Sequence, residues 1–231
     1  MFEKVISWAD AVDDGDLWIS MHQLRKQEFV DRLGYDVPED DGLEYDQYDT
    51  PAARYAIAYN DDRRVIGTMR LTPTLKPYML KDLWPELLPP AFVPNKSIWE
   101  ASRIVINKTD NMAVRKEALM RVLTVSQKFG IDNNISSFIG VMYPGIWRAA
   151  ILRNGCPATK IAQIKQGDKT LQSGSVPVSE EAYRTMKNRI TDFTSTNKFA
   201  IPSRNTSLAI EPAFVVSQDG LPKTPVSSQS R

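Results

Sequence analysis

The sequence predicts an α/β fold, a three-layer α/β/α sandwich with a mixed central sheet. Short apolar, β-branched stretches alternate with amphipathic stretches of helical spacing over residues 1–194, as in sheets covered by helices. The stretch Ile98–Ile106, IWEASRIVI, is apolar at six of nine positions, which is typical of a strand buried on both faces. We expect this strand to be the centre of the sheet.

In the first half we expect a strand over Phe2–Ser7 and then a helix, which starts at the acids Asp13, Asp14 and Asp16 and ends at Gly34. An acidic loop over 35–50 should follow. Next we expect hairpin strands over 54–59 and 64–72, a short helix over 79–84 and the central strand. In the second half we expect a helix over 112–129, with Asp110 as its N-cap and Gly130 at its end, and then a strand over 135–142. A helix over 145–154 should begin after Pro144. Strands over 158–164 and 174–178 and a helix over 180–192 should complete the domain. Residues 195–231 are rich in Ser, Thr and Pro, so a flexible tail is expected after a domain spanning 1–194.

Composition limits the class of protein. The chain has 231 residues, 42% of them apolar, and a net charge of +1, which argues against an extended surface for nucleic acid or membrane. One cysteine, Cys156, and one histidine, His22, exclude an intrachain disulfide and a Cys-based or multi-His metal site, so no metal is expected. The chain shows neither a signal-peptide pattern nor an apolar run near the roughly 20 residues of a membrane span, and a soluble cytoplasmic protein is expected.

The central strand carries Glu100, Ser102 and Arg103. Strict alternation would place Glu100 and Ser102 on one face of the sheet and Arg103 on the other. Because buried charges need partners, we hypothesise that Glu100 lines a cleft and that Arg103 holds a carboxylate on the far face. A buried Glu–Arg pair that only stabilises the sheet is the alternative.

Eight positions resemble the signature of the LuxI-type acyl-homoserine-lactone synthases, over about residues 1–190. They are Arg25, Phe29 and Tyr35, the Asp-x2-Asp pair Asp46 and Asp49, Arg70 at a GxxR strand end, and the Glu-x2-Arg pair Glu100 and Arg103. The family usually has Trp at the position of Tyr35 and Phe at that of Trp84; both changes keep an aromatic ring.

The resemblance implies a fold similar to the Gcn5-related N-acetyltransferases, in which two central parallel strands, here 98–106 and 135–142, part to form a cleft. It also implies a reaction. The amine of S-adenosylmethionine attacks an acyl thioester on acyl carrier protein, or on coenzyme A, and the methionine carboxylate then closes a lactone and expels methylthioadenosine. S-adenosylmethionine is thus a substrate, and no cofactor is expected.

Roles follow from the resemblance and from charge. Glu100 is the candidate base, because the attacking amine must lose a proton. Arg25, Arg70 and Arg103 should pair with Asp46, Asp49 and Glu100 and order the acidic loop. The candidate contacts to S-adenosylmethionine are Phe29, Tyr35, Trp84, Ser102 and Arg103. The candidate lining of the acyl pocket is Val141, Met142, Ile146 and Trp147. The candidate residues for docking a carrier protein are Arg148, Arg153, Lys160 and Lys165.

Each assignment has an alternative. Trp84 can be a core residue, the basic cluster can be a solvated face, and His22 and Cys156 are expected to be structural. Two other functions stay open: a coenzyme A-dependent N-acyltransferase acting on another amine, and a non-catalytic S-adenosylmethionine-binding protein. The Asp-x2-Asp loop with Arg25 disfavours the first, and intact Glu100 and Arg103 disfavour the second.

Overall fold

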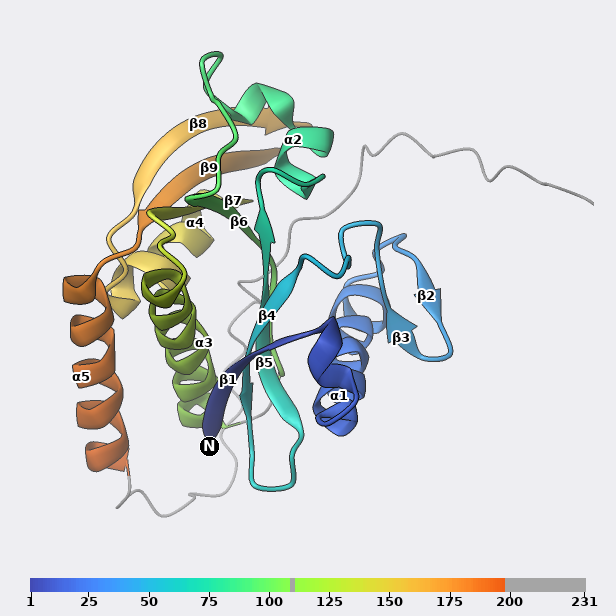
Figure 1. The fold of residues 1–231 in the computed structure, drawn as a ribbon, viewed down its shortest axis with the longest axis vertical. Helices are drawn as coiled ribbons and strands as arrows, with labels where there is room; N and C mark the ends of the chain where they lie inside the picture. Colours follow the sequence, from blue (N-terminus) through green and yellow to red (C-terminus); the bar gives the residue numbers. More distant parts are fainter. Residues whose placement is uncertain (109–110, 198–231) are drawn as a thin grey trace, which may run out of the picture.

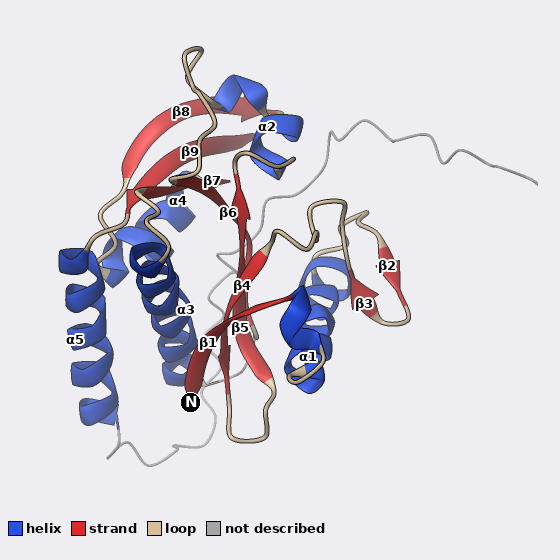
Figure 2. Ribbon diagram, viewed as in Figure 1, coloured by secondary structure: helices blue, strands red, loops and turns tan. Residues whose placement is uncertain are grey.

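The computed structural model describes residues 1–108 and 111–197. A seven-stranded sheet of order β1-β4-β5-β6-β7-β9-β8 runs through it, with helices on both faces (Figures 1 and 2). Helices α3 and α5 lie side by side on one face and α1 lies on the other, which confirms the three-layer α/β/α arrangement (Figure 1).

The strands are β1 (Phe2–Ser7), β4 (Arg54–Tyr59), β5 (Val65–Pro73), β6 (Ile98–Ile106), β7 (Ser137–Met142), β8 (Thr159–Gln166) and β9 (Lys169–Pro177), with a separate small pair β2 (Glu39–Asp40) and β3 (Leu43–Glu44). The helices are α1 (Gly15–Lys26), α2 (Met79–Leu83), α3 (Met112–Asp132), α4 (Pro144–Ile146) and α5 (Glu180–Asn197). Irregular helical turns extend α1 over Gln27–Arg32 and α4 over Trp147–Ile151 and Leu152–Asn154.

Strands β6 and β7 run parallel and pair only at their beginnings. The paired residues are Ile98 with Ser137, Trp99 with Phe138 and Glu100 with Ile139. Beyond Glu100 the strands part, as the resemblance implies. A Cβ at Gly140 would lie 2.7 Å from the carbonyl oxygen of Ala101, so glycine allows the close approach of the two backbones directly before they diverge.

Helix α3 differs from its predicted bounds at both ends. Asn111 caps it, accepting hydrogen bonds from the N–H groups of Ala113 and Val114, whereas the predicted cap, Asp110, lies outside the described residues. Gly130 does not end the helix, which continues to Asp132. Instead Gly130 allows close packing, because a Cβ there would lie 2.8 Å from a methyl of Val178.

The C-terminal elements are longer than predicted. The two short strands expected near 158–164 and 174–178 are the long hairpin β8–β9, which turns at Gly167 with a φ of +59°. Helix α5 continues to Asn197, so the predicted boundary at 194 falls inside it, and the rest of the predicted tail lies outside the described residues. In the described part of the chain, no helix combines the length and apolar character needed to cross a bilayer.

Candidate active site

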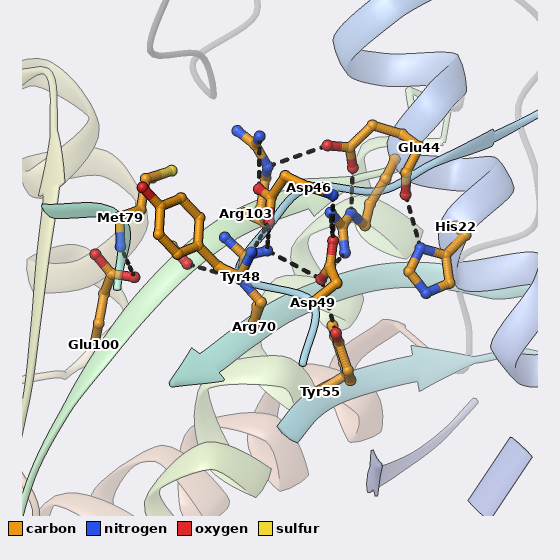
Figure 3. Close-up of polar contacts among 12 residues, drawn as sticks. His22, Glu44, Asp46, Tyr48, Asp49, Tyr55, Arg70, Met79, Glu100 and Arg103 are labelled. Atoms are coloured by element: carbon orange, nitrogen blue, oxygen red, sulfur yellow. Dashed lines mark hydrogen bonds and ion pairs between the residues drawn. The ribbon is translucent and has the colours of Figure 1, made fainter. Parts of the chain in front are cut away.

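The acidic loop is held to the fold by an ion-pair network around Arg25, Arg70 and Arg103. Figure 3 shows Arg70 and Arg103 with their carboxylate partners. Arg25 lies on the face of α1 that is buried with Leu17 and Met21. Its Nη1 and Nη2 atoms each donate to Asp49 at 2.8 Å, and its Nε lies 2.5 Å from Glu44. This fork-to-carboxylate geometry needs arginine.

Arg70 connects the loop to the central strand. Through Nη1 it contacts Asp46 at 2.5 Å and Asp49 at 3.0 Å, and through Nε it donates to the Ser102 hydroxyl at 3.2 Å. Arg70 and Ser102 are register partners on β5 and β6, so their side chains leave the same face of the sheet.

The expectation that Arg103 lies on the far face is wrong. Arg103 contacts Asp46 at 2.8 Å and Glu44 at 3.3 Å, on the same side as Ser102. The cause is an irregularity in β6: the register with β5 shifts between Thr68 and Arg70, and Arg103 has a φ of +51°. Such a bulge re-aims a side chain that alternation would send to the other face.

The arginines keep Asp46 and Asp49 ionised. Burial raises the pKa of Asp46, but Arg70 and Arg103 outweigh it, so that pKa lies below its ordinary value. Asp49 behaves likewise beside Arg25 and Arg70, and it also accepts a 2.7 Å bond from the Tyr55 hydroxyl. Sequence reasoning assigned Glu100 as the third acid of this network, but Glu44 takes that place, and Glu100 accepts backbone hydrogen bonds from Met79 and Leu80 instead.

His22 of α1 also holds the acidic loop in place. Its Nδ1 lies 2.8 Å from the carbonyl oxygen of Glu44, and its ring stacks on Tyr45 with centroids 3.8 Å apart. Burial, followed by the charge of Arg25, lowers the pKa of His22 to about 4. A neutral, buried His22 agrees with its expected packing role.

Glu100 is buried beside the parting strands. Its carboxylate accepts hydrogen bonds from the N–H groups of Leu80 at 2.5 Å and Met79 at 3.2 Å (Figure 3). Burial raises its pKa, against the opposing effect of Arg70 and the two backbone hydrogen bonds. The side chain is not open to solvent, since only 1% of the residue is exposed, so Glu100 does not line an open cleft as hypothesised.

An apolar cavity of about 40 Å³ lies between β6, β7, α3 and Trp147. Met142 and Trp147 line it, whereas Val141 and Ile146 of the predicted acyl pocket do not. Val141 belongs to the apolar cluster around α2, and Ile146 packs into the core beneath α3. Ile139, the register partner of Glu100, also contributes to the lining, so the cavity reaches the strand position next to Glu100.

The predicted aromatic contacts separate into two groups. Phe29 and Tyr35 stack with centroids 6.0 Å apart, and the Arg103 guanidinium lies 5.3 Å from the Phe29 ring centre. Trp84 is buried in the different cluster around α2, with Tyr48 and Leu171. The structure therefore does not bring Trp84 together with Phe29 and Tyr35.

The four basic residues predicted to dock a carrier are all exposed and follow β7 in the chain: Arg148, Arg153, Lys160 and Lys165. Arg153 lies against α5, where its carbonyl oxygen accepts a 2.8 Å bond from Arg189. Lys160 donates to Gln163 at 2.7 Å on β8.

Solved structures share this fold. LasI, an AHL synthase, superposes with a TM-score of 0.69 at 25% identity, covering 81% of this chain and 94% of its own. BjaI, a CoA-dependent acyl-homoserine lactone synthase solved with MTA, gives 0.72 at 24% identity, covering 82% and 89%. FeeM, an N-acyl amino acid synthase from uncultured soil microbes, gives 0.52 at 12% identity, covering 78% and 94%. The fold class is therefore that of the N-acyltransferases related to Gcn5, as expected.

The sequence comparisons are more specific. The model of the autoinducer synthase family matches residues 12–186, and this chain belongs to that family of acyltransferases. An acyl-homoserine-lactone synthase of Aliivibrio fischeri is 30% identical over 171 residues, which are 71% of this chain and 88% of the relative. One of Pseudomonas aeruginosa is 32% identical over 142 residues, 60% of this chain and 71% of the relative.

Proposed function

We propose that this protein is an acyl-homoserine-lactone synthase that joins an acyl group from a thioester to the amine of S-adenosylmethionine. One observation carries the proposal: Glu100 lies between the arginine–carboxylate network, through Ser102 and Arg70, and the apolar cavity, through Ile139. A base that removes the amine proton belongs between a site for a charged amino acid and a site for an acyl chain.

In the first step the amine nitrogen attacks the thioester carbon, Glu100 takes the amine proton, and the carbon–sulfur bond then breaks. Its raised pKa makes Glu100 a better base than an ordinary carboxylate. In the second step a methionyl carboxylate oxygen attacks the carbon beside the sulfonium, the lactone closes, and methylthioadenosine leaves as a neutral thioether. Proximity governs this step. Phe29, Tyr35, Ser102 and Arg103 are proposed to hold S-adenosylmethionine.

We assign the acyl chain to the cavity beside Met142 and Trp147, and its carrier protein to the basic residues Arg148, Arg153, Lys160 and Lys165, with acyl-coenzyme A as the alternative donor. Complementary charge favours encounter with an acidic carrier protein.

Purified protein, S-adenosylmethionine and a series of acyl thioesters test the proposal, with mass spectrometry of the products. A homoserine-lactone product and methylthioadenosine in equal amounts are expected; thiol release without lactone would favour another N-acyltransferase. The donor is identified by kcat/KM for matched acyl-carrier and acyl-coenzyme A substrates. Reversal of charge at Arg148 and Arg153 should raise KM for the carrier substrate alone.

A further inference from the structure

Three buried polar atoms near Glu100 have no hydrogen-bond partner within residues 1–108 and 111–197. They are Nη2 of Arg70, Oγ1 of Thr72 and Oη of Tyr78, and each of these residues is 0% exposed. Thr72 is the register partner of Glu100 on β5. A fold rarely leaves several buried polar atoms unpaired in one region, because each costs stability, unless a ligand supplies the partners.

Tyr78 is next in the chain to the two residues whose N–H groups bind Glu100. It directly precedes α2, whose first two N–H groups, those of Met79 and Leu80, donate to the Glu100 carboxylate. Its side chain is buried in one cluster with Ile139 of β7, the residue that pairs with Glu100 and lines the apolar cavity. The phenol therefore lies on the α2 side of the sheet, beside the candidate base and close to the point where β6 and β7 part.

The Tyr78 hydroxyl is suited to donate a hydrogen bond. Burial, followed by the charges of Glu100 and Asp82, raises the pKa of Tyr78 to about 12, so the hydroxyl keeps its proton at neutral pH. In apolar surroundings a donor without a protein partner interacts strongly with an oxygen that gains negative charge.

We propose that Tyr78 is a catalytic residue that donates a hydrogen bond to the carbonyl oxygen of the acyl thioester. When the amine nitrogen bonds to the carbonyl carbon, the C=O electron pair moves onto this oxygen and Glu100 takes the amine proton. The pair then re-forms the C=O bond, the C–S bond breaks, and the sulfur leaves with the proton from Glu100. Tyr78 keeps its proton throughout. The inference rests on the proposed function.

The test is Tyr78→Phe in the full chain, measured by thiol release and by lactone formation. We expect kcat to fall about 10²-fold, as for other single oxyanion donors, with KM for S-adenosylmethionine within about twofold. The thermal midpoint should equal or exceed that of the wild type, because the variant removes a hydroxyl without a partner from the interior. Tyr59→Phe is the matched control: Tyr59 is half-buried on β4 against Phe2, and no change is expected.

An unchanged kcat would overturn the role of Tyr78, as would a raised KM for S-adenosylmethionine at unchanged kcat. If Tyr78→Phe does not fold, 3,5-difluorotyrosine at position 78 keeps the shape and lowers the phenol pKa. Its rate should fall at a lower pH than that of the wild type, and superimposable pH profiles would overturn the proposal. Absence of lactone from the wild type overturns the proposed function instead, so the two failures are distinguishable.

Discussion

The guanidinium of Arg25 and the carboxylate of Asp49 form two parallel hydrogen bonds of 2.8 Å, with both side chains almost fully buried. This contact links α1 to the acidic loop, and Arg70 extends it to β5 through the same carboxylate. The loop over the candidate S-adenosylmethionine site is therefore fixed before any substrate binds, which reduces the entropy cost of ordering it at each turnover.

Arg25→Lys should destabilise the protein and slow it. Lysine keeps the charge but cannot form the fork to Asp49 together with the contact to Glu44, so we expect a loss of about 2–4 kcal/mol in the free energy of unfolding. Urea denaturation measures the loss, and KM for S-adenosylmethionine should rise. Arg63→Lys is the control, since Arg63 pairs with Asp14 and Asp16 at the surface and should show no measurable change. Equal effects of the two variants would contradict a special role for the buried fork.

Glu100→Gln should lower kcat by about 10²-fold or more, because the amide cannot accept the amine proton. KM for S-adenosylmethionine should change little. In the wild type the acid limb of the pH–rate profile should lie above the ordinary pKa of a glutamate, since burial raises the pKa of Glu100. Steady-state kinetics over pH measures both effects. Glu117→Gln removes a carboxylate on α3 that pairs with Arg121 and should leave kcat unchanged. Full activity in Glu100→Gln would remove Glu100 as the base.

Sequence patterns predicted the order of the main elements, and the family resemblance implied the parting strands and the charged residues that meet around the acidic loop. They placed Arg103 on the wrong face because no residue pattern announces the left-handed conformation that produces the bulge. They also missed Glu44, because composition suggests solvent for an acidic run whereas tertiary contacts bury this one. Alternation along β7 could have separated Val141 from Met142, since neighbouring strand residues face opposite sides.

His22 should make stability depend on pH. Its pKa is 6.5 in the reference state and about 4 in the fold, so between these values the unfolded chain takes up a proton that the native chain does not. Stability is therefore lost as pH falls through this window, by about 1.4 kcal/mol for each pH unit within it. Urea midpoints of the wild type and His22→Asn measure it, because asparagine can still donate to the Glu44 carbonyl. The wild type should lose more stability than the variant. Glu100 titrates in both proteins, so its contribution to the pH dependence of stability cancels in the comparison. Identical pH dependence of the two proteins would contradict a lowered pKa for His22.

Trp147 should limit the length of the acyl chain. Its ring lines the apolar cavity, packs against Gly174, and is fixed by a 2.9 Å hydrogen bond from Nε1 to the carbonyl oxygen of Gln172. Trp147→Leu should enlarge the cavity and shift preference toward longer chains, by about fourfold in kcat/KM for each added methylene that becomes buried. Competition among thioesters of increasing length, read out by mass spectrometry of the lactones, measures the shift. Trp99→Phe is the control, because Trp99 packs against Phe129 outside the cavity lining. If both variants keep the wild-type product profile, the cavity beside Trp147 does not hold the acyl chain.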